Sequence, residues 1–572
     1  MGQPSLEASH AIVYLTYGAF LLMGTGVAWK FRNQSKGEFL AGNRTQTAVP
    51  LALNFIASGE LYRDYSIKLM LAWETCCRSS ISPYPPSSSR TVPPLGSAIL
   101  FAYPQLATIA GVQGVVTYAL SSALPLFIFA ALGPIIRRKC PEGFVLTEWT
   151  RQRYGHIAAL YLSFMTCVTL FLYMVSELSA VGQVVTLLTG IDGLPVLIVE
   201  CVITTIYTSL GGFQISFFTD NIQGVMVVGL IIIATVSIGV ETKIDTSLID
   251  PSGLTKPSLL GWQLLYILPI AILTNDFFLS HFWLRTFASK TDKDLWIGIT
   301  IAATAVLIII TLVGSTGLIA AWSGVYPGSD PENPVDGAIV FFALLEQLPS
   351  WVVGIVLVMV VTLSTAAFDS FQSAMVTSVS NDVFRNRLNI WYIRLGVVLI
   401  MIPVVSIAIR APSILQIYLI SDLVSAATIP VLVLGLWEKA YWWRGFEVVV
   451  GGLGGLLTVF IFGTIYYGNA KQGAELMLLQ QGLFTGDWGC FGAFVAAPVG
   501  GVLWGFGALA LRLSVQFIIA KRKGVRFDAL DKPKQVDEQL VRGDAGGVGH
   551  PADEEDTVSE TPGIAKSIGK FF

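Results

Sequence analysis

Charged residues are scarce in this chain. They make up 13% of its 572 residues, whereas hydrophobic residues make up 53%. Soluble domains carry about 25% charged residues, and no water-soluble fold of this length hides so much apolar surface. The net charge of −3 gives no reason to expect a nucleic-acid partner. The composition therefore predicts a polytopic protein whose main partner is the lipid bilayer.

Metal-ligating and catalytic motifs are also lacking. The six cysteines are scattered, without CxxC or zinc spacing, which argues against a disulfide framework or a bound metal. The chain shows no Walker sequence, no HExxH and no GxSxG. The first ten residues lack the basic region of a cleaved signal peptide. We therefore expect neither an enzyme nor a cofactor.

Long apolar runs dominate what is present. A membrane span needs roughly 20 apolar residues. Thirteen candidate spans are found, the second of them broken: 11–29, 49–107, 115–136, 157–188, 194–210, 218–240, 262–278, 297–322, 351–379, 390–409, 414–437, 448–467 and 491–519. Every alternate loop is basic, as in the run from Arg137 to Lys139, whereas the loop with Asp330 and Glu332 is acidic. The positive-inside rule then puts the amino terminus outside and the carboxyl terminus in the cytosol.

One short segment gives the chain a family resemblance. Residues 211–223 read Gly-Gly-Phe-Gln-Ile-Ser-Phe-Phe-Thr-Asp-Asn-Ile-Gln, in which a paired glycine ends one helix and Thr219-Asp220 opens the next. Upstream stand Thr147-Glu-Trp and Arg153-Tyr-Gly. Together these residues resemble the sodium:solute symporter family, over about 46–520, and within it the fungal branch of urea and polyamine permeases.

The resemblance implies an all-α fold of about 13 transmembrane helices. Its core would be two inverted five-helix repeats in the leucine-transporter arrangement, with the first core helix unwound at the midplane. We expect an outside segment, first helix and linker at 1–45, the ten-helix core at 46–437 and two further helices at 438–523. We expect the polar stretch 524–572 to be a disordered cytosolic tail. We interpret it as inert, and a regulatory role is the alternative.

Residues 60–95 do not fit the core. They combine seven charged residues, five of them within 61–78, with a serine- and proline-rich run, which cannot lie in hydrocarbon without partners. Their flanks read as two halves of one helix. We interpret the segment as a translated intron or mis-predicted exon; the alternative is a genuine extracellular loop.

A pair of hydroxyls in the ninth span predicts the ion site. Ser364 and Thr365 match the sodium-binding helix of the family, and the resemblance implies that they and Val361 join carbonyls near Ala57. Neutral oxygens suit a small cation that must leave in each cycle. The alternative is that the hydroxyls bond their own helix and aid packing. Asp220 would lie on the ion exit path, and it also suits a helix cap.

Seven residues are candidates for the substrate path: Tyr173, Glu177, Ser280, His281, Phe368, Asp369 and Gln372. Intramembrane carboxylates are functional by default. Glu177 follows Tyr173 by one turn on a helix that lines this path in the family, and Asp369 shares a face with Thr365. Ser280 and His281 resemble the first two positions of a family motif, which are polar and face the substrate in that family. The alternative for His281 is a structural role, because a lone histidine in a membrane helix is more often hydrogen-bonded within the fold.

Three further carboxyls in or near spans have weaker interpretations. Asp276 and Asp422 are functional candidates by default; the alternatives are that Asp276 caps a break in its helix and that Asp422 is only hydrogen-bonded within the bundle. Glu200 is the weakest candidate of all.

These features predict a cation-coupled secondary active transporter in the plasma membrane. It would import a small polar nitrogenous solute such as urea or a polyamine, with Na⁺ or H⁺, by alternating access. Carboxylates near the path favour a cationic amine or a strongly hydrogen-bonding amide. The alternatives are a sensor that binds solute without moving it, or a symporter for an amino acid or choline.

Overall fold

The computed structural model describes residues 4–30, 97, 99–140, 146–328, 334–384, 387, 389–410, 414–437, 439–480, 482–483, 486–527 and 529–531. The predicted insert 60–95, Ala57 and the tail beyond residue 531 lie outside these residues. Within them the secondary structure is helical, without strands. The elements are α1 (Leu6–Lys30), α5 (Ile99–Lys139), α6 (Leu146–Tyr154), α7 (His156–Thr189), α8 (Gly193–Glu241), η1 (Thr246–Leu248), α9 (Ile249–Ser252), α10 (Leu259–Phe278), α11 (Ser280–Ala288), α12 (Asp292–Trp322), η2 (Gly337–Ile339), α13 (Val340–Leu345), α14 (Ser350–Ser378), η3 (Val379–Val383), α15 (Ile390–Ala408), α16 (Ile414–Val433), η4 (Leu434–Leu436), α17 (Gly445–Tyr467), α18 (Ala470–Met477) and α19 (Gly489–Lys523).

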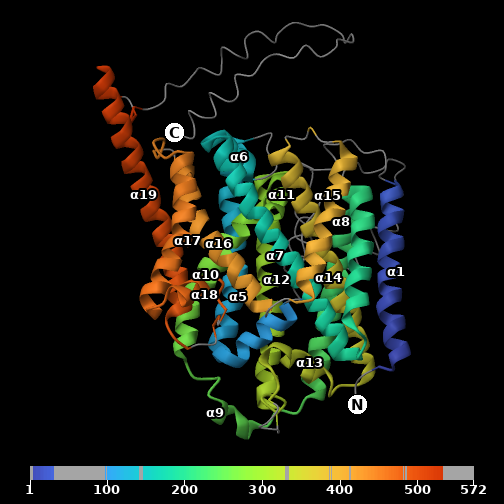
Figure 1. Ribbon diagram of the computed structural model, residues 1–572. Coiled ribbons are helices and arrows are strands. Elements are labelled where there is room, and N and C mark those ends of the chain that lie inside the picture. The colour runs from blue at the N-terminus through green and yellow to red at the C-terminus, as the bar shows by residue number, and fades with distance from the viewer. Residues whose placement is uncertain are drawn as a thin grey trace, which may run out of the picture.

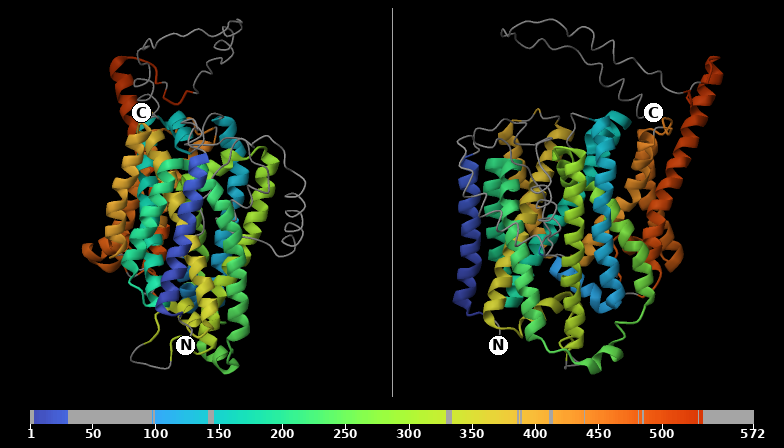
Figure 2. Two further views of the ribbon diagram at one scale, coloured as in Figure 1. Left: turned by 90° about the vertical axis from the view of Figure 1, so that its right-hand side faces the viewer. Right: turned by 180° about the vertical axis from the view of Figure 1, so that it is seen from behind.

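The long helices stand side by side in one bundle (Figure 1). Helix α1 forms one flank and α19 the opposite flank, and the views of Figure 2 show the same arrangement. Short helices α9 and α13 lie at the lower edge, and α6 lies at the upper edge. In the described residues nine helices are long and apolar enough to cross a membrane, and three shorter apolar segments, two in α8 and one in α15, accompany them. The expected all-α, multi-pass architecture is confirmed.

Helix α8 contains two of the predicted spans. It has 49 residues, which would be about 74 Å long if straight, more than twice the ~30 Å hydrocarbon thickness. Both ends lie beside elements of the lower edge. Gly193 lines a cavity with Ile339 of η2, and the Asp245 amide, just after α8, donates to Trp322 O at 2.8 Å. Predicted spans 194–210 and 218–240 both fall in α8. The helix continues through the paired glycine at 211–212, where we expected it to end.

Helix α5 bends at Gly111, between the second and third predicted spans. Gly111 has φ 62° and ψ −155°, outside helical values. A Cβ at this position would lie 2.0 Å from Leu254 O, and the next amide, of Val112, donates to the same oxygen at 2.9 Å. Only glycine has both the conformational freedom and the small size that this junction requires.

A second interruption separates α10 from α11. Leu279 stands between them with φ −69° and ψ 99°, an extended conformation. The Trp283 indole N–H donates to Phe277 O at 2.9 Å, which satisfies one carbonyl that the break frees. Broken helices at membrane depth are tolerated where such partners exist or where they line a cavity. The predicted span 262–278 ends at this interruption.

Helices α17 and α19 pack closely beside the core. A Cβ at Gly455 would lie 2.6 Å from Ala497 O, so the two backbones approach through small residues. At one end a buried ion pair joins them: Arg512 Nε lies 2.6 Å from Glu447 Oε1, with side-chain exposures of 3% and 0%. Arg512 also donates to Trp442 O at 2.7 Å, and the Arg444 amide donates to Glu447 Oε2 at 2.9 Å.

We expect Arg512→Met to lower the free energy of unfolding by roughly 3–5 kcal/mol, because Glu447 would remain buried without its cation. The matched control is Arg526→Met, whose pair with Asp531 is exposed at 82% and 54% and should contribute about 0–1 kcal/mol. Thermal unfolding in detergent micelles measures both. Equal effects of the two substitutions would contradict the assigned role of the buried pair.

Candidate functional site

Ser364, the first hydroxyl of the predicted ion site, contacts a buried carboxyl. Its Oγ in α14 donates to Glu200 Oε1 of α8 at 2.6 Å. The Tyr17 hydroxyl of α1 donates to Glu200 Oε2 at 3.1 Å. All three side chains are fully buried, and no basic residue in the described ranges forms a salt bridge with Glu200. The residue that sequence reasoning ranked last thus lies against the predicted ion ligand.

Thr365, the second hydroxyl, bonds its own helix. Its Oγ1 donates to Val361 O at 2.6 Å, so two of the predicted ligands contact each other. This is the packing geometry that we weighed as the alternative, although a carbonyl oxygen keeps a second lone pair for another partner. Ala57 lies outside the described residues, so the meeting of α14 with a broken helix at Ala57 stays a prediction.

One turn further along α14, Asp369 again faces α8. It is fully buried and accepts a hydrogen bond from Thr208 Oγ1 at 3.4 Å. Glu200 with Ser364 and Thr208 with Asp369 thus form two successive polar contacts between α8 and α14. The side chain of Asp220, the predicted exit-path residue on α8, lies outside the described set.

Glu177 and Tyr173 lie in a central polar cluster. Glu177 Oε2 accepts bonds from the Ser97 amide at 2.7 Å and from the Ser97 hydroxyl at 3.0 Å. Its Oε1 accepts from the Tyr418 hydroxyl of α16 at 3.3 Å. The Tyr173 ring lies 4.9 Å from the Tyr418 ring and 5.4 Å from that of Phe371, centroid to centroid. The sequence pairing of Tyr173 with Glu177 therefore corresponds to a shared site, to which α16 adds an aromatic ring.

The cluster extends to the α10–α11 break. Asn275, near the end of α10, donates to the Tyr173 hydroxyl and accepts from Ser421 Oγ of α16 at 3.4 Å. Asp276 and Asp422 are the next residues on these two helices. Neither carboxyl forms a hydrogen bond or ion pair with any residue in the described ranges. Among the described residues the polar side-chain contacts at this level are made by the adjacent Asn275 and Ser421, and the cap at Asp276 and the hydrogen bond of Asp422 stay predictions.

The remaining substrate-path candidates lie elsewhere. Ser280 at the start of α11 exchanges a hydrogen bond with Ser378 at 2.9 Å. Gln372 donates to Thr205 Oγ1 at 3.0 Å and lines a cavity of about 390 Å³ against α15, which Tyr173 does not line. Phe368 is fully buried; it is Phe371 that contacts Tyr173. A substrate path through Tyr173, Phe368 and Gln372 stays a prediction, and the His281 side chain lies outside the described residues.

The Thr-Glu-Trp and Arg-Tyr-Gly motifs form α6, which contacts the ends of two other helices. Thr147 Oγ1 donates to Asp382 Oδ1 of η3 at 2.8 Å, and Arg151 lies 3.5 Å from the same oxygen. Arg153 donates to Ala440 O at 2.7 Å, and the Tyr154 hydroxyl donates to Leu432 O at 2.7 Å. These contacts join α6 to the upper ends of α14 and α16.

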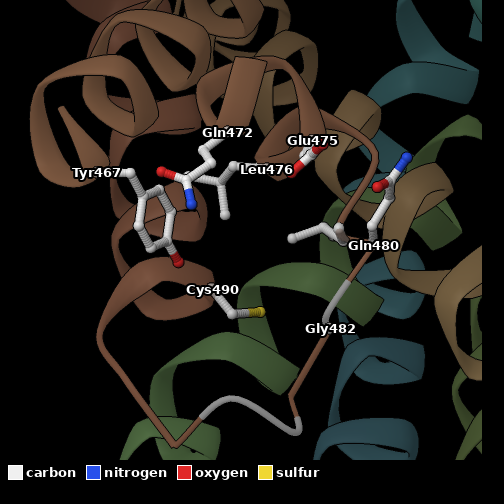
Figure 3. Close-up of a pocket in the computed structure, with 8 residues that line it drawn as sticks. Tyr467, Gln472, Glu475, Leu476, Gln480, Gly482 and Cys490 are labelled. Carbon is white, nitrogen blue, oxygen red and sulfur yellow. The ribbon is translucent and has the colours of Figure 1, made fainter. Parts of the chain in front are cut away.

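A smaller pocket lies outside the core, between α17, α18 and the start of α19 (Figure 3). Tyr467, Gln472, Glu475 and Cys490 line it. The Tyr467 hydroxyl donates to Asp487 Oδ2 at 2.8 Å, and Glu475 pairs with the exposed Lys471 at 3.7 Å. Because its carboxyls already have partners, this pocket lacks the unpaired charge that marks the central cluster.

Sequence reasoning missed Tyr418 and undervalued three carboxyls: Glu200, Asp276 and Asp422. The available signal was the intramembrane carboxyl itself, which is expensive in hydrocarbon wherever it occurs. For Glu200 no sequence neighbour identified its partners Ser364 and Tyr17.

Comparison with known proteins agrees with the observed fold. The model of the sodium:solute symporter family matches residues 79–446. The spermidine transporter DUR31 of Candida albicans is 50% identical over 540 residues, which cover 94% of this chain and 96% of that protein. The probable urea active transporter 1 of Schizosaccharomyces pombe is 29% identical over 122 residues, 21% of this chain and 18% of that protein.

Among solved structures, a Na⁺-coupled sialic acid symporter in an outward-open state matches with a TM-score of 0.65. It is 15% identical in sequence, and the match covers 88% of this chain and 97% of that one. This likeness supports the leucine-transporter-like arrangement of the helices.

Substitutions at Glu200 test the contact between α1, α8 and α14. Glu200→Gln keeps an oxygen that accepts from Ser364 and gains an amide that donates to Tyr17, so we expect the free energy of unfolding to fall by less than about 1.5 kcal/mol. Glu200→Ala leaves two buried hydroxyls unpaired and opens a cavity, with an expected fall of roughly 2–5 kcal/mol. Thermal unfolding in micelles compares them; an alanine variant as stable as the glutamine variant would refute the contact.

Proposed function

The chain belongs to the sodium:solute symporter family, and from this premise we propose that it imports a polyamine such as spermidine across the plasma membrane, driven by a coupled cation. Its relative DUR31 is a spermidine transporter. A polyamine is a flexible chain with several ammonium groups, so its binding site needs buried negative charge and aromatic surface.

The observation that carries this proposal is the Glu177 carboxyl in the central cluster. It is 1% exposed, and it is oriented by Ser97 and Tyr418. The rings of Tyr173 and Tyr418 lie next to it. A carboxylate accepts strong charge-assisted hydrogen bonds from an ammonium group, and aromatic faces attract the same cation.

The coupling ion is proposed to bind at Val361, Ser364 and Thr365, with carbonyls near Ala57 completing the site. Na⁺ suits a site made of neutral oxygens, and H⁺ is the alternative ion. Glu200, 2.6 Å from Ser364 Oγ, would add negative charge beside this site and so favour a cation there. The ion would stabilise the conformation that binds solute, and its downhill entry would drive uptake.

Alternating access would then move one repeat against the other around this centre. In the proposed orientation the amino terminus is outside, and α6 is cytosolic. Its contacts with Asp382 and Leu432 would hold the cytosolic side of the bundle closed until solute and ion are bound.

Purified protein reconstituted in proteoliposomes should accumulate radiolabelled spermidine when a Na⁺ gradient is imposed. Unlabelled urea, choline and proline should compete weakly, because none of them offers two ammonium groups. Accumulation driven only by a pH gradient would identify H⁺ as the coupling ion. Saturable binding without accumulation under either gradient would reject transport in favour of a sensor.

We expect Glu177→Gln to lower spermidine uptake at limiting concentration by roughly 10- to 100-fold, since a hydrogen bond to a charged group contributes about 1.5–3 kcal/mol. The amide still accepts from Ser97, so the fold and the surface expression should persist. The control is Glu241→Gln, at the exposed end of α8. Full uptake by the Glu177→Gln variant would argue against this carboxyl as a substrate ligand.

A further inference from the structure

Two carboxyls beside the α10–α11 break have no partner in the described part of the chain. Asp276 is 9% exposed and Asp422 is 7% exposed, so both are more than nine-tenths buried. The residue before each is hydrogen-bonded: Ser421 donates to Asn275 at 3.4 Å. Thr274, which precedes Asn275, and Ser425, one turn after Asp422, exchange a hydrogen bond at 3.0 Å. The polar groups on this contact between α10 and α16 are thus satisfied except at the two carboxyls.

The hydrogen bonds between Ser421 and Asn275 and between Thr274 and Ser425 bring α10 and α16 together at the level of the two carboxyls, and Asp422 acts electrostatically on Asp276. An ionised carboxylate in the interior needs a cation. Asp276 stands in the last turn of α10, where the helix dipole is negative and itself attracts positive charge. This arrangement favours a bound cation more strongly than either carboxyl would alone.

Aromatic rings surround the same place. Tyr173 of α7 and Tyr118 of α5 both lie within electrostatic range of Asp422, and Tyr118 stacks on Tyr103 with centroids 4.0 Å apart. Metal ions are usually held by several oxygen ligands, whereas an alkylammonium group combines carboxylate hydrogen bonds with aromatic faces. The surroundings therefore favour an organic ammonium over a metal ion.

Tyr173 links this pair of carboxyls to Glu177. Its hydroxyl accepts a hydrogen bond from Asn275, next to Asp276. Its ring contacts Tyr418, whose hydroxyl donates to Glu177. Negative charge is thus present on both sides of one tyrosine, in a site formed by α7, α10 and α16.

From this geometry we infer that Asp276 and Asp422 form a second ammonium site, which binds one end of a diammonium substrate while Glu177 binds the other. The inference rests on the proposed function and deepens it, because it assigns the preference for diamines over monoamines to named residues. A monoamine would fill one of the two sites and leave the other carboxylate uncompensated.

The first experiment measures competition against radiolabelled spermidine uptake in proteoliposomes. The competitors are butane-1,4-diamine and butylamine, which share a carbon chain and differ by one amine. With the wild-type protein the diamine should compete at least tenfold better. Asp276→Asn and Asp422→Asn should each raise the diamine concentration that halves spermidine uptake about tenfold or more. The butylamine concentration that does so should stay nearly unchanged. Glu241→Gln is the matched control and should preserve the wild-type difference.

The second experiment reads binding without transport. Millimolar butane-1,4-diamine should raise the thermal unfolding temperature of the purified wild-type protein, and both asparagine variants should lose this shift. Because asparagine is nearly isosteric with aspartate, their unfolding without ligand should remain a single transition, which shows that they are folded.

The outcomes separate the inference from the proposed function. Diamine stabilisation that depends on Asp276 and Asp422, without any spermidine uptake, would reject polyamine import and support the ammonium site. If both asparagine variants take up spermidine and keep the wild-type preference for the diamine, the second ammonium site is wrong, whereas the proposed polyamine import is still supported. A wild-type protein that diamines do not stabilise would overturn the site as well.

Discussion

A carboxyl group inside a bilayer must have a partner, and this requirement organises the centre of the molecule. Isolated charge is costly in hydrocarbon, so such groups pair, accept hydrogen bonds or bind a cation. Glu177, Glu200 and Asp369 each accept bonds from hydroxyls on neighbouring helices. Asp276 and Asp422 make no such bonds in the described residues. The buried carboxyls thus differ in whether a described hydroxyl orients them, as it does Glu177, or whether they make no such bond.

Helix interruptions bring these groups together. Gly111 bends α5, so that its first part and its longer second part take different directions. Leu279 ends α10 directly after Asp276. An uninterrupted helix satisfies its own carbonyls, whereas a broken one presents polar backbone at membrane depth. In this chain the break also places a carboxylate at the negative end of a helix dipole, which makes the cluster more attractive to cations.

The polar contacts occur at two levels of the bundle. At the upper edge, α6 contacts η3 and the end of α16 through Thr147, Arg151 and Tyr154. Deeper in the bundle lie the Glu177 cluster and the Glu200–Ser364 contact. Outside both, α17 and α19 pack through small residues and a buried ion pair.

The sequence alone determined the membrane class, the apolar spans and the family, because hydropathy and local motifs are written along the chain. It also supplied the list of intramembrane carboxyls and the close relation of Tyr173 to Glu177, which are one helical turn apart. Only the tertiary structure decided which carboxyl has which partner. Ser364 and Glu200 are 164 residues apart, and Tyr418 and Glu177 are 241 apart. Such partners meet through the packing of helices from distant parts of the chain, and a short-range pattern carries no record of that packing.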